Sequence, residues 1–402
     1  MPPPHWAKLK AALLQMGGRY GGLLYALLAV GASLQAYWLG PKPNSSYTHY
    51  NNFLIFRQAY FHLCAGQDLY RPYPAEHWDL FKYSPTFPLL MAPLAYLPDW
   101  LGLVGWNLLN ALVLFWGVRY LPLAPSLQTA ILLFSALELL TALQNAQSNA
   151  LIAGLLLLGF GAYERGQFFW GSFPIALTGY IKLFGLGGYL VGLFYPARLR
   201  IALYGLFWGA LLGILPLGVV SPAQLGALYA SWGRLLAQDY AESIGLSVAG
   251  WLYSWFGEIL PKSHLTLIGS LALLLPLLRW QLYATRAFRC LFLAYFLLWS
   301  VLFNHKAESP TYVIAVVGVS LWYFGRPRAS LDTALLIGVF VFASLSPTDL
   351  FPKVLRESFV KPYYLKPFSC LLVWLRLGGE LLWAKRAFFE EDGPRARARA
   401  AG

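Results

Sequence analysis

The 402-residue chain is 58% hydrophobic and only 12% charged, which is too apolar for a soluble core wrapped in a polar surface. The formal net charge is +13, but the basic residues lie in short loops between apolar runs and in the terminal RARARA tail. This placement favours orientation by membrane electrostatics over nucleic-acid binding. Cys64, Cys290 and Cys370 lie far apart without metal-ligand spacing, so we expect no disulfide framework and no zinc framework.

The apolar runs predict an all-α, polytopic transmembrane helix bundle with about twelve crossings. The first run ends at GPKPNSS without a small-residue cleavage motif, so we expect it to stay as an anchor. The expected crossings begin near Tyr20, Trp100, Ser126, Ala150, Phe168, Phe184, Ile201, Leu265, Ala287, Thr311, Leu331 and Lys366.

The basic residues of the short loops orient the expected bundle. With the N-terminus in the cytoplasm, the short basic loops all fall on the inner face of the plasma membrane. We expect one membrane domain over residues 1–384 and a basic cytoplasmic tail over residues 385–402. The long loops, residues 40–99, 220–262 and 346–364, then reach the extracytoplasmic face. Because functional residues concentrate on loops, we expect the chemistry on that face.

Two apolar pieces, residues 85–98 and 247–257, are too short to cross a bilayer, and the first contains four prolines. We interpret both as re-entrant or interfacial half-helices. Irregular backbone at membrane depth is tolerated only when it is buried in protein or lines a wet cavity, so both pieces are expected beside the working site.

The first outer loop collects groups suited to sugar chemistry. Asn51 and Asn52 come early, and PAEHWDLFKYSP then supplies Glu76, Trp78, Asp79 and Lys82. An aromatic face beside carboxylates suits a sugar ring, although aromatic belts at membrane interfaces produce similar strings.

The motif QNAQSN places four side-chain amides at a turn between two apolar helices: Gln144, Asn145, Gln147 and Asn149. These amides could hold a hydroxylated ligand, whereas a helix cap needs only one or two of them. Lys182, in TGYIKLFG, lies at the outer turn of a short helical hairpin. An ammonium in apolar surroundings needs an anion or a carbonyl cluster as its partner, and a snorkelling lysine is the alternative.

The stretch NHKAESP separates two very apolar runs and supplies His305, Lys306 and Glu308. Cations beside amide donors would bind a phosphate, and Glu308 could orient one of them. An ordinary charged turn is the alternative. Glu138, within an apolar helix, is either paired with a cation or part of the same cavity. Asp239 and Glu242 fall on the same expected face.

Five stretches taken together resemble the GT-C polytopic glycosyltransferases, most closely family 87. They contain a Gly-x-Asp-Leu-Tyr ending, a Tyr-x-Pro turn, a Gln-x-x-Asn-like turn, a Lys-aromatic turn and a Ser-Leu loop, in the family's order. The stretches are residues 53–70, 82–98, 143–158, 179–185 and 242–257. The resemblance implies a GT-C-like fold and the use of polyprenyl-phosphate sugars, often mannose, on the outer membrane face.

One position departs from the family pattern. The resemblance implies a catalytic aspartate in an Asp-aromatic context just before the amphipathic stretch, and this chain has Asn52 followed by Phe53 there. An amide cannot act as a general base. The role would then pass to Asp79, our first choice, or to Glu76, Glu308 or Glu242.

We therefore expect an inverting transfer of a hexose such as mannose from a polyprenyl-phosphate carrier to a hydroxyl of a glycolipid or glycan. Lys182, Lys306, His305 and Lys82 would bind the donor phosphate. The amides of the QNAQSN turn, with Asn51, Asn52, Trp78 and Glu242, would bind the sugar or the acceptor. The partners are the lipid-linked sugar, the acceptor and the bilayer, and we expect no cofactor. The alternatives are a membrane transporter or lipid flippase, and a catalytically silent homologue.

Overall fold

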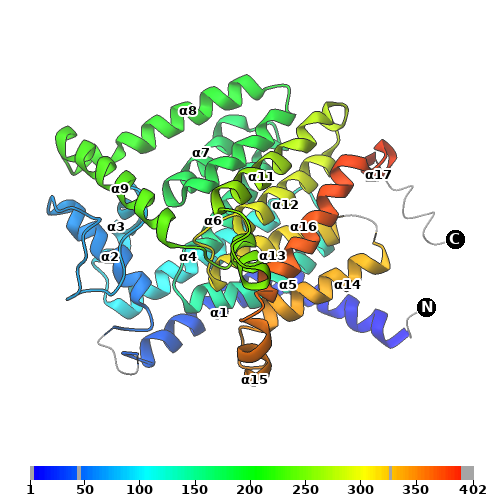
Figure 1. The fold of residues 1–402 in the computed structure, drawn as a ribbon, viewed down its shortest axis with the longest axis horizontal. Helices are drawn as coiled ribbons and strands as arrows, with labels where there is room; N and C mark the ends of the chain where they lie inside the picture. Colours follow the sequence, from blue (N-terminus) through cyan, green and yellow to red (C-terminus); the bar gives the residue numbers. More distant parts are fainter. Residues whose placement is uncertain (1–3, 43–46, 326–327, 391–402) are drawn as a thin grey trace. The chain divides into compact units, whose positions relative to one another are not determined.

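The structure, a computed structural model, describes residues 4–42, 47–325 and 328–390, with the backbone alone for residues 4–17 and 241–242. The described residues form helices joined by turns and contain no β-strand (Figure 1), so the predicted all-α class is confirmed. The chain divides into two compact units, and each is described by itself. Unit 1 comprises Met1–Leu186 and Ile201–Ser243, and unit 2 comprises Gly187–Arg200 and Ile244–Gly402.

Unit 1 is built around the apolar helix α6. Helix α4 packs against α6 and α1, α1 also packs against α5, and α7 packs against α6. The helices of this unit are α1 (Pro4–Trp38), α2 (Asn51–Cys64), η1 (Phe87–Met91), α3 (Ala92–Ala95), α4 (Asp99–Arg119), α5 (Pro125–Gln144), α6 (Asn149–Tyr163), α7 (Phe168–Ile181), α8 (Arg198–Ile214), η3 (Leu215–Gly218) and α9 (Pro222–Glu242), with α8 beginning in unit 2.

Glycine sets the close approach of α4 and α6. A Cβ atom on Gly154 would lie 2.5 Å from the backbone of Val113, and one on Gly117 would lie 2.6 Å from the Gly154 carbonyl oxygen. Every residue of α6 except Leu158 is buried. Small residues at such contacts let helix backbones pack closely in membrane proteins, where lipid removes the hydrophobic drive for association.

Helix α8 has the opposite character, because its large apolar side chains face outward. Leu199, Leu206 and Phe207 are 72%, 71% and 51% exposed. With η3 it forms an apolar helix, Arg198–Gly218, that is long enough to cross a bilayer. An apolar surface of this size suits a lipid environment.

Helix α9 lies where we expected a loop, in residues 220–262. The Ser221 hydroxyl caps its start by accepting a hydrogen bond from the Gln224 N–H at 3.2 Å, and Pro222 occupies the first helical position. Both are ordinary helix-start signals. The second expected outer loop therefore contains a helix that the sequence analysis did not predict, and the position of this segment on the extracytoplasmic face stays a prediction.

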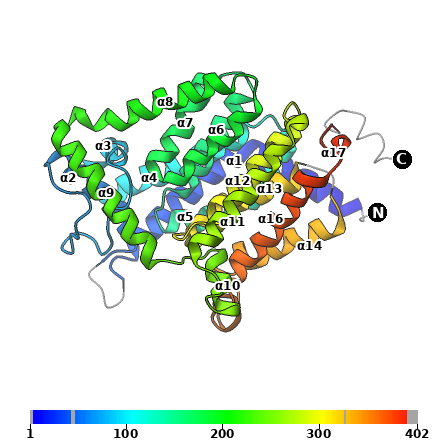
Figure 2. The ribbon, with the colours of Figure 1, turned by 45° about the horizontal axis from the view of Figure 1, so that its top comes forward.

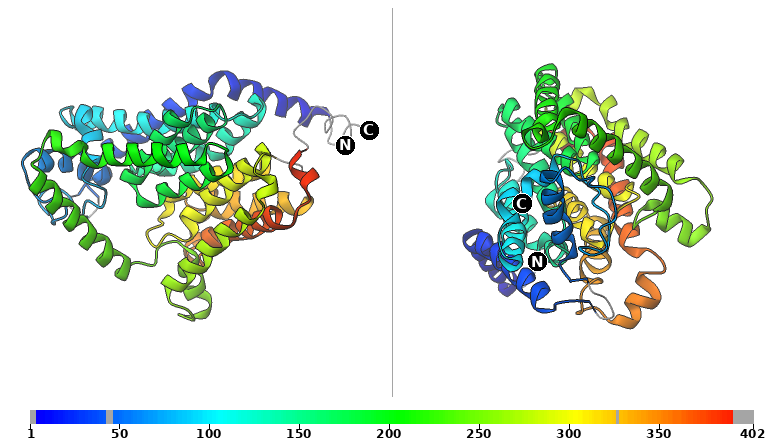
Figure 3. Two further views of the ribbon diagram at one scale, coloured as in Figure 1. Left: turned by 90° about the horizontal axis from the view of Figure 1, so that it is seen from above. Right: turned by 90° about the vertical axis from the view of Figure 1, so that its left-hand side faces the viewer.

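Unit 2 has α12 and α13 at its centre, where α13 is buried from Tyr312 to Tyr323. Helix α16 packs against α12 and α14, and the three helices α12, α13 and α16 lie side by side (Figures 2 and 3). The helices are η2 (Leu183–Phe194), which begins in unit 1, α10 (Val248–Phe256), α11 (Lys262–Leu274), η4 (Leu275–Leu278), η5 (Trp280–Leu282), α12 (Arg286–Leu302), η6 (Ser309–Thr311), α13 (Tyr312–Phe324), α14 (Ser330–Val339), η7 (Phe340–Leu345), α15 (Lys353–Leu355), η8 (Arg356–Val360), α16 (Leu365–Trp383) and α17 (Arg386–Glu390).

Three helices of the described chain are long and apolar enough to cross a membrane: Asp99–Arg119, Pro125–Gln144 and Arg198–Gly218. Six further apolar helices are shorter: Asn149–Tyr163, Phe168–Ile181, Leu183–Phe194, Lys262–Leu278, Ser309–Phe324 and Ser330–Leu345. The count of twelve crossings and the single membrane domain over residues 1–384 stay predictions. Most of the tail predicted to be cytoplasmic, residues 391–402, lies outside the described residues.

The two pieces interpreted as half-helices are short in the structure. Residues 85–98 contain η1 and α3, which together cover nine residues, Phe87–Ala95. Residues 247–257 contain the nine-residue α10, whose start is capped by the Ser247 hydroxyl. Neither is long enough to cross a bilayer.

Candidate active site

A lysine shared by two carboxylates lies in the first long loop of unit 1. The Lys82 Nζ atom is 3.1 Å from Asp79 Oδ1 and 3.6 Å from Asp239 Oδ1. The side chains of Lys82, Asp79 and Asp239 are 28%, 34% and 12% exposed. Burial alone would lower the pKa of Lys82, but the charges and hydrogen bonds of both aspartates outweigh it and raise that pKa. Lys82 is therefore a cation at neutral pH.

Helix α9 forms one wall of this cluster. Besides Asp239, it supplies Trp232, whose Nε1 donates to the Lys82 carbonyl oxygen at 3.2 Å, and Ser231, whose hydroxyl donates to Asp68 Oδ2 at 3.0 Å. These contacts hold both ends of the loop of residues 68–82 against α9. The sequence placed Asp239 on the expected face without giving it a role, because a helix was not expected there.

The second cation, Lys182, lies at the end of α7. Its Nζ atom donates to Asn149 Oδ1 at 2.9 Å, and Asn149 Nδ2 donates to Gln147 Oε1 at 2.7 Å. Asn149 is fully buried, at 0% exposed. The ammonium therefore has an amide carbonyl as a partner, in agreement with the physical requirement that a cation in apolar surroundings be coordinated.

Tyr83 connects the two lysines. It follows Lys82 in the chain, and the Lys182 Nζ atom lies 5.9 Å from the centre of its ring. The Ser148 hydroxyl donates to the Tyr83 hydroxyl at 3.3 Å, and the Ser84 hydroxyl donates to the Tyr180 carbonyl oxygen at 2.5 Å. The loop is thus docked on the ends of α6 and α7. The sequence analysis missed Tyr83, although it stands between the Lys and Ser of the quoted KYSP motif.

The four side-chain amides of the QNAQSN turn have two kinds of hydrogen-bond partner. Asn149 contacts Lys182, and Gln147 contacts Asn149, as described above. Gln144 instead donates to Gln35 Oε1 of α1 at 2.8 Å, and Asn145 donates to the Thr141 carbonyl oxygen at 2.8 Å, within α5. Two of the four amides therefore stabilise the helices, so the structure brings only half of the predicted amide set to the cation.

A left-handed residue produces this division. Ala146 has φ +48° and is 1% exposed, a conformation that costs an alanine about 1–2 kcal/mol. Its carbonyl oxygen accepts a hydrogen bond from Trp106 Nε1 at 2.9 Å, and its N–H donates to the Leu143 carbonyl oxygen at 2.9 Å. Local backbone strain of this kind is often found at functional sites.

The two asparagines at the start of α2 hold the loop and the turn in place. Asn51, 3% exposed, accepts from the Trp78 N–H at 3.3 Å. Asn52 donates to the Asn145 carbonyl oxygen at 2.8 Å. Trp78 itself is 56% exposed, so the face of its indole is open to a ring ligand.

Glu76 lies beside the histidines of the first loop. Its Oε2 atom is 3.0 Å from His62 Nε2, and the His62 ring stacks on Tyr73 with centroids 3.8 Å apart. His77, 3% exposed, contacts the Asp79 carbonyl oxygen through Nδ1 at 2.7 Å. Burial lowers the pKa of His77, and the contact with Asp79 only partly offsets it. This histidine is therefore neutral at pH 7.

The NHKAESP residues lie in unit 2. The Lys306 N–H donates to Asn304 Oδ1 at 2.9 Å, and the Leu246 N–H donates to the Ala307 carbonyl oxygen at 2.6 Å. Gly245, at φ +63°, is needed there because a Cβ atom would lie 2.5 Å from the His305 carbonyl oxygen. His305 also lines a small pocket with Lys262 and Thr266.

Glu308 caps the helix that follows. It is the N-cap residue of η6, and its N–H donates to Thr311 Oγ1 at 3.1 Å. Lys366, 5% exposed, donates to Ser309 Oγ at 3.0 Å and lies 4.9 Å from the centre of the Tyr312 ring. The sequence analysis gave Lys366 no site role, although a lysine at the start of an apolar helix is itself an indication of a functional residue.

Glu138 and Glu242 are the remaining predicted residues. Glu138 is fully buried within α5. Glu242 ends α9, and its side chain is outside the described part of the structure. Within the described part of the chain, His, Cys, Asp and Glu side chains form no group of three or more that could hold a metal ion.

The family model for glycosyltransferase family 87 matches residues 81–304. The chain belongs to glycosyltransferase family 87. It is therefore a glycosyltransferase and a membrane protein of that family. The match includes Lys82, Lys182 and Asp239, begins two residues after Asp79 and ends one residue before His305. No curated protein matches the chain.

Proposed function

We propose that this enzyme transfers a sugar from a polyprenyl-phosphate carrier to a hydroxyl of a glycolipid or glycan on the extracytoplasmic face of the plasma membrane. The observation that carries the proposal is the pair of ammonium groups, Lys82 and Lys182, beside Tyr83 and within the family match. Two cations and an amide chain provide the charge and the donors that a phosphate needs. The carrier's chain would lie in the bilayer while its phosphate reaches these groups.

The reaction would be a single displacement. The acceptor oxygen forms a bond to the anomeric carbon, and the bond between that carbon and the phosphate oxygen breaks, so that the configuration inverts. The electron pair leaves with the polyprenyl phosphate, whose charge Lys82 and Lys182 stabilise. Phosphate leaves readily, so no general acid is required. The acceptor's proton passes to a carboxylate.

Asp79 is the proposed base. In the structure it is paired with Lys82, which Asp239 also contacts. An arriving phosphate would compete for Lys82 and weaken the hold of Lys82 on Asp79. Because Asp239 contacts the same ammonium and lies within the family match, it is the alternative base. The indole of Trp78 and the amides of Gln147 and Asn149 would contact the sugar or the acceptor.

The roles of His305 and Lys306 in donor binding, and of Glu308 as an alternative base, remain part of the proposal. Support for them comes from the sequence pattern and from the place of His305 in a pocket lined by Lys262. Since Glu308 caps a helix turn, its replacement would also test the fold, which makes Lys306 the better variant.

The test uses purified protein in lipid nanodiscs with radiolabelled polyprenyl-phosphate mannose, glucose and galactose. Donor binding and donor turnover are measured for the wild type and for Lys182→Ala, Lys306→Ala and Asp79→Asn. Arg234→Ala is the matched control, because Arg234 is an exposed cation of α9. Binding should fall in both lysine variants and persist in Asp79→Asn, which should lose turnover.

A failure to bind any such carrier would overturn the proposal. Transport or lipid flipping would then be tested by following carrier movement across the bilayer of proteoliposomes. Binding without turnover in the wild type, for every acceptor tried, would favour a catalytically silent homologue instead.

A further inference from the structure

The connection between η7 and α16 in unit 2 has a two-sided pattern. Every fourth residue from Asp349 is charged, and every fourth residue from Phe351 is apolar or aromatic. The charged ridge is Asp349, Lys353, Glu357 and Lys361, and the apolar ridge is Phe351, Leu355, Phe359 and Tyr363. Positions two apart lie on opposite sides of a helix, whereas positions four apart share a side. Since α15 and η8 make residues 353–360 helical, Lys353 and Glu357 face away from Leu355 and Phe359.

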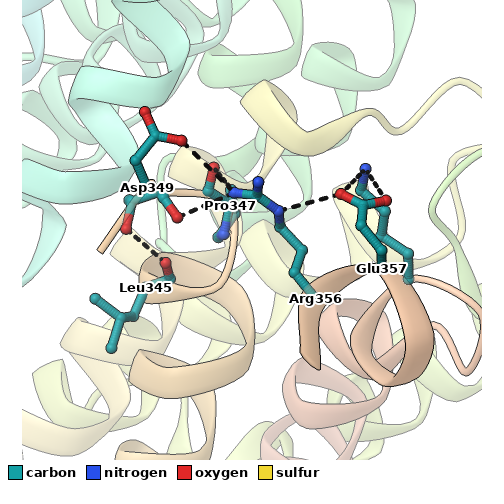
Figure 4. A network of polar contacts seen from close by, with 7 residues as sticks. Leu345, Pro347, Asp349, Arg356 and Glu357 are labelled. Carbon is teal, nitrogen blue, oxygen red and sulfur yellow. Dashed lines mark hydrogen bonds and ion pairs between the residues drawn. The ribbon is translucent and has the colours of Figure 1, made fainter. Parts of the chain in front are cut away.

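Three residues of the charged ridge, Asp349, Glu357 and Lys361, are linked through Arg356 in the network drawn in Figure 4. Lys361 Nζ lies 2.8 Å from Glu357 Oε2, and Arg356 Nε donates to Glu357 Oε1 at 3.3 Å. Arg356 also donates to the Thr348 carbonyl oxygen at 3.0 Å, which ties the helical turn to the preceding loop. Asp349 is fully exposed. These groups form ion pairs and hydrogen bonds with one another at the surface, and the charged side of the connection needs contact with water.

Three of the four residues of the apolar ridge are exposed, and Phe351 is half-buried. Leu355, Phe359 and Tyr363 are 50%, 49% and 47% exposed. The rings of Phe359 and Tyr363 lie 5.5 Å apart, so these two side chains form a continuous apolar strip. An exposed apolar strip of this kind marks a contact with a partner or with lipid.

Helix α10 extends this strip. Trp255 Nε1 donates to the Tyr363 carbonyl oxygen at 2.7 Å, and the Ser254 hydroxyl donates to the Pro362 carbonyl oxygen. Trp255 and Phe256 are 40% and 57% exposed. Helix α10 and the connection lie together at one end of unit 2 (Figure 2).

The elements at the two ends of the connection indicate that its apolar strip contacts lipid. It leaves the apolar helical run Ser330–Leu345 and enters α16, whose composition is also mainly apolar. A segment between two apolar helices of a membrane protein lies near the level where they reach water. Tyrosine and tryptophan are enriched at that level, and a helix with one apolar and one charged side binds there, parallel to the surface.

We propose that residues 349–363, together with Trp255 and Phe256 of α10, form an interfacial anchor that lies in the membrane–water interface. Its apolar ridge enters the boundary between head groups and acyl chains, and its charged ridge faces water. The anchor is independent of the proposed sugar transfer, because none of its residues belongs to the candidate active site.

The test is a labelling scan of the full chain in lipid nanodiscs. Cys64 is exposed, whereas Cys290 and Cys370 are buried, so a Cys64→Ser background leaves no exposed thiol among the described residues. Single cysteines are placed on the apolar ridge (Leu355→Cys and Phe359→Cys) or on the charged ridge (Lys353→Cys and Glu357→Cys). Each is labelled with bimane, and its fluorescence is quenched by brominated phospholipid or by aqueous iodide.

We expect bromines near the head-group boundary to quench labels at 355 and 359 most, at a depth of about 5–10 Å, while iodide quenches labels at 353 and 357. A label at Leu206, exposed on the candidate span that contains α8, is the lipid-facing control and should respond to deeper bromines.

Three outcomes would overturn the anchor. Strong iodide quenching at all four positions would show a segment standing in water. Lipid quenching at all four would indicate insertion across the head-group region instead of an interfacial position. Shielding of 355 and 359 from both quenchers would indicate a protein partner.

Discussion

Replacing Asp79 by asparagine removes the proposed base while keeping nearly the same shape. In the structure Asp79 and Asp239 contact the same ammonium, at 3.1 and 3.6 Å. The Asp79→Asn variant therefore leaves Lys82 with one carboxylate partner, and Asp239→Asn leaves it with the other. The two variants change the charge around Lys82 by the same amount, so they form a matched pair in which the proposed base differs.

The expected magnitudes are well separated. A positioned general base contributes about 10²–10⁴-fold to the rate, which corresponds to roughly 3–5 kcal/mol of activation free energy. The Lys82–Asp79 pair is about one-third exposed on both sides, and pairs screened by water to this extent contribute about 1 kcal/mol or less to stability. Asp79→Asn should therefore lower kcat by at least about 100-fold with little change in thermal stability and no loss of donor binding.

The assay measures kcat, the donor dissociation constant and the melting temperature for both variants in nanodiscs. If Asp239→Asn loses turnover while Asp79→Asn keeps it, Asp239 is the base and our assignment is wrong. Equal losses in the two variants would mean that both aspartates act through the charge state of Lys82, and the base would then lie elsewhere. Full activity in both variants would refute the reasoning altogether.

Three further predictions concern single side chains. Lys182→Ala should raise the donor dissociation constant roughly tenfold to a hundredfold, since a hydrogen bond to a charged group contributes about 1.5–3 kcal/mol. Equilibrium binding of the labelled carrier measures this constant. An unchanged dissociation constant would contradict the role of Lys182 in phosphate binding. Gly154→Ala should destabilise the protein by about 1–3 kcal/mol because its Cβ would lie 2.5 Å from the α4 backbone. The control Gly209→Ala should not destabilise it, because no atom lies within 4 Å of that Cβ position. The thermal unfolding temperatures of the two variants are compared with that of the wild type. Burial holds the pKa of His77 below its ordinary value of 6.5, so its contribution to stability is complete above pH 6.5 and decreases below it, by at most about 1.4 kcal/mol per pH unit. Unfolding temperatures at pH 7.5 and 5.5 should differ less in His77→Gln than in the wild type, and an equal difference would refute the assignment.

The sequence was sufficient for the helical class and for the position of several turns. Apolar runs bounded by polar clusters predicted the end of α5 and the start of α6 on either side of QNAQSN. The need of Lys182 for a carbonyl partner was also predictable, because an ammonium in apolar surroundings must be coordinated. The partner, Asn149, belongs to the turn that the sequence had already selected.

The directions of the four amides were not predictable. They depend on Ala146, which adopts a left-handed conformation that glycine or asparagine would ordinarily signal. Without that signal, spacing alone could not show that Gln144 turns toward α1 while Gln147 turns toward Asn149. The Ala146 carbonyl oxygen also accepts a hydrogen bond from the indole of Trp106, a residue far away in sequence, and residue spacing does not reveal such a contact.

Helix α9 shows a different reason for failure. Its start signals, Ser221 and Pro222, were present in the sequence. Its composition, however, is less apolar than that of the neighbouring helices, so hydropathy did not predict it as a membrane crossing. A helix that covers a loop needs only a narrow apolar stripe, so hydropathy is a poor guide to it. Asp239 was consequently left without a partner in the sequence analysis, although it contacts Lys82.

The partners of the two lysines have a consequence for how the proposed site would work. A cation in apolar surroundings is costly unless it is paired, and in the structure carboxylates pair with Lys82 while an amide carbonyl holds Lys182. On the proposed function, the donor phosphate would take the place of these partners, so its binding energy would be offset by the interactions it displaces. The same exchange would loosen Asp79 from Lys82 only when a donor is present, and the base would then become available at the step that needs it. Salt should weaken donor binding. At both lysines the phosphate would bind as the counterion of an ammonium group, and that attraction between opposite charges is screened as ionic strength rises.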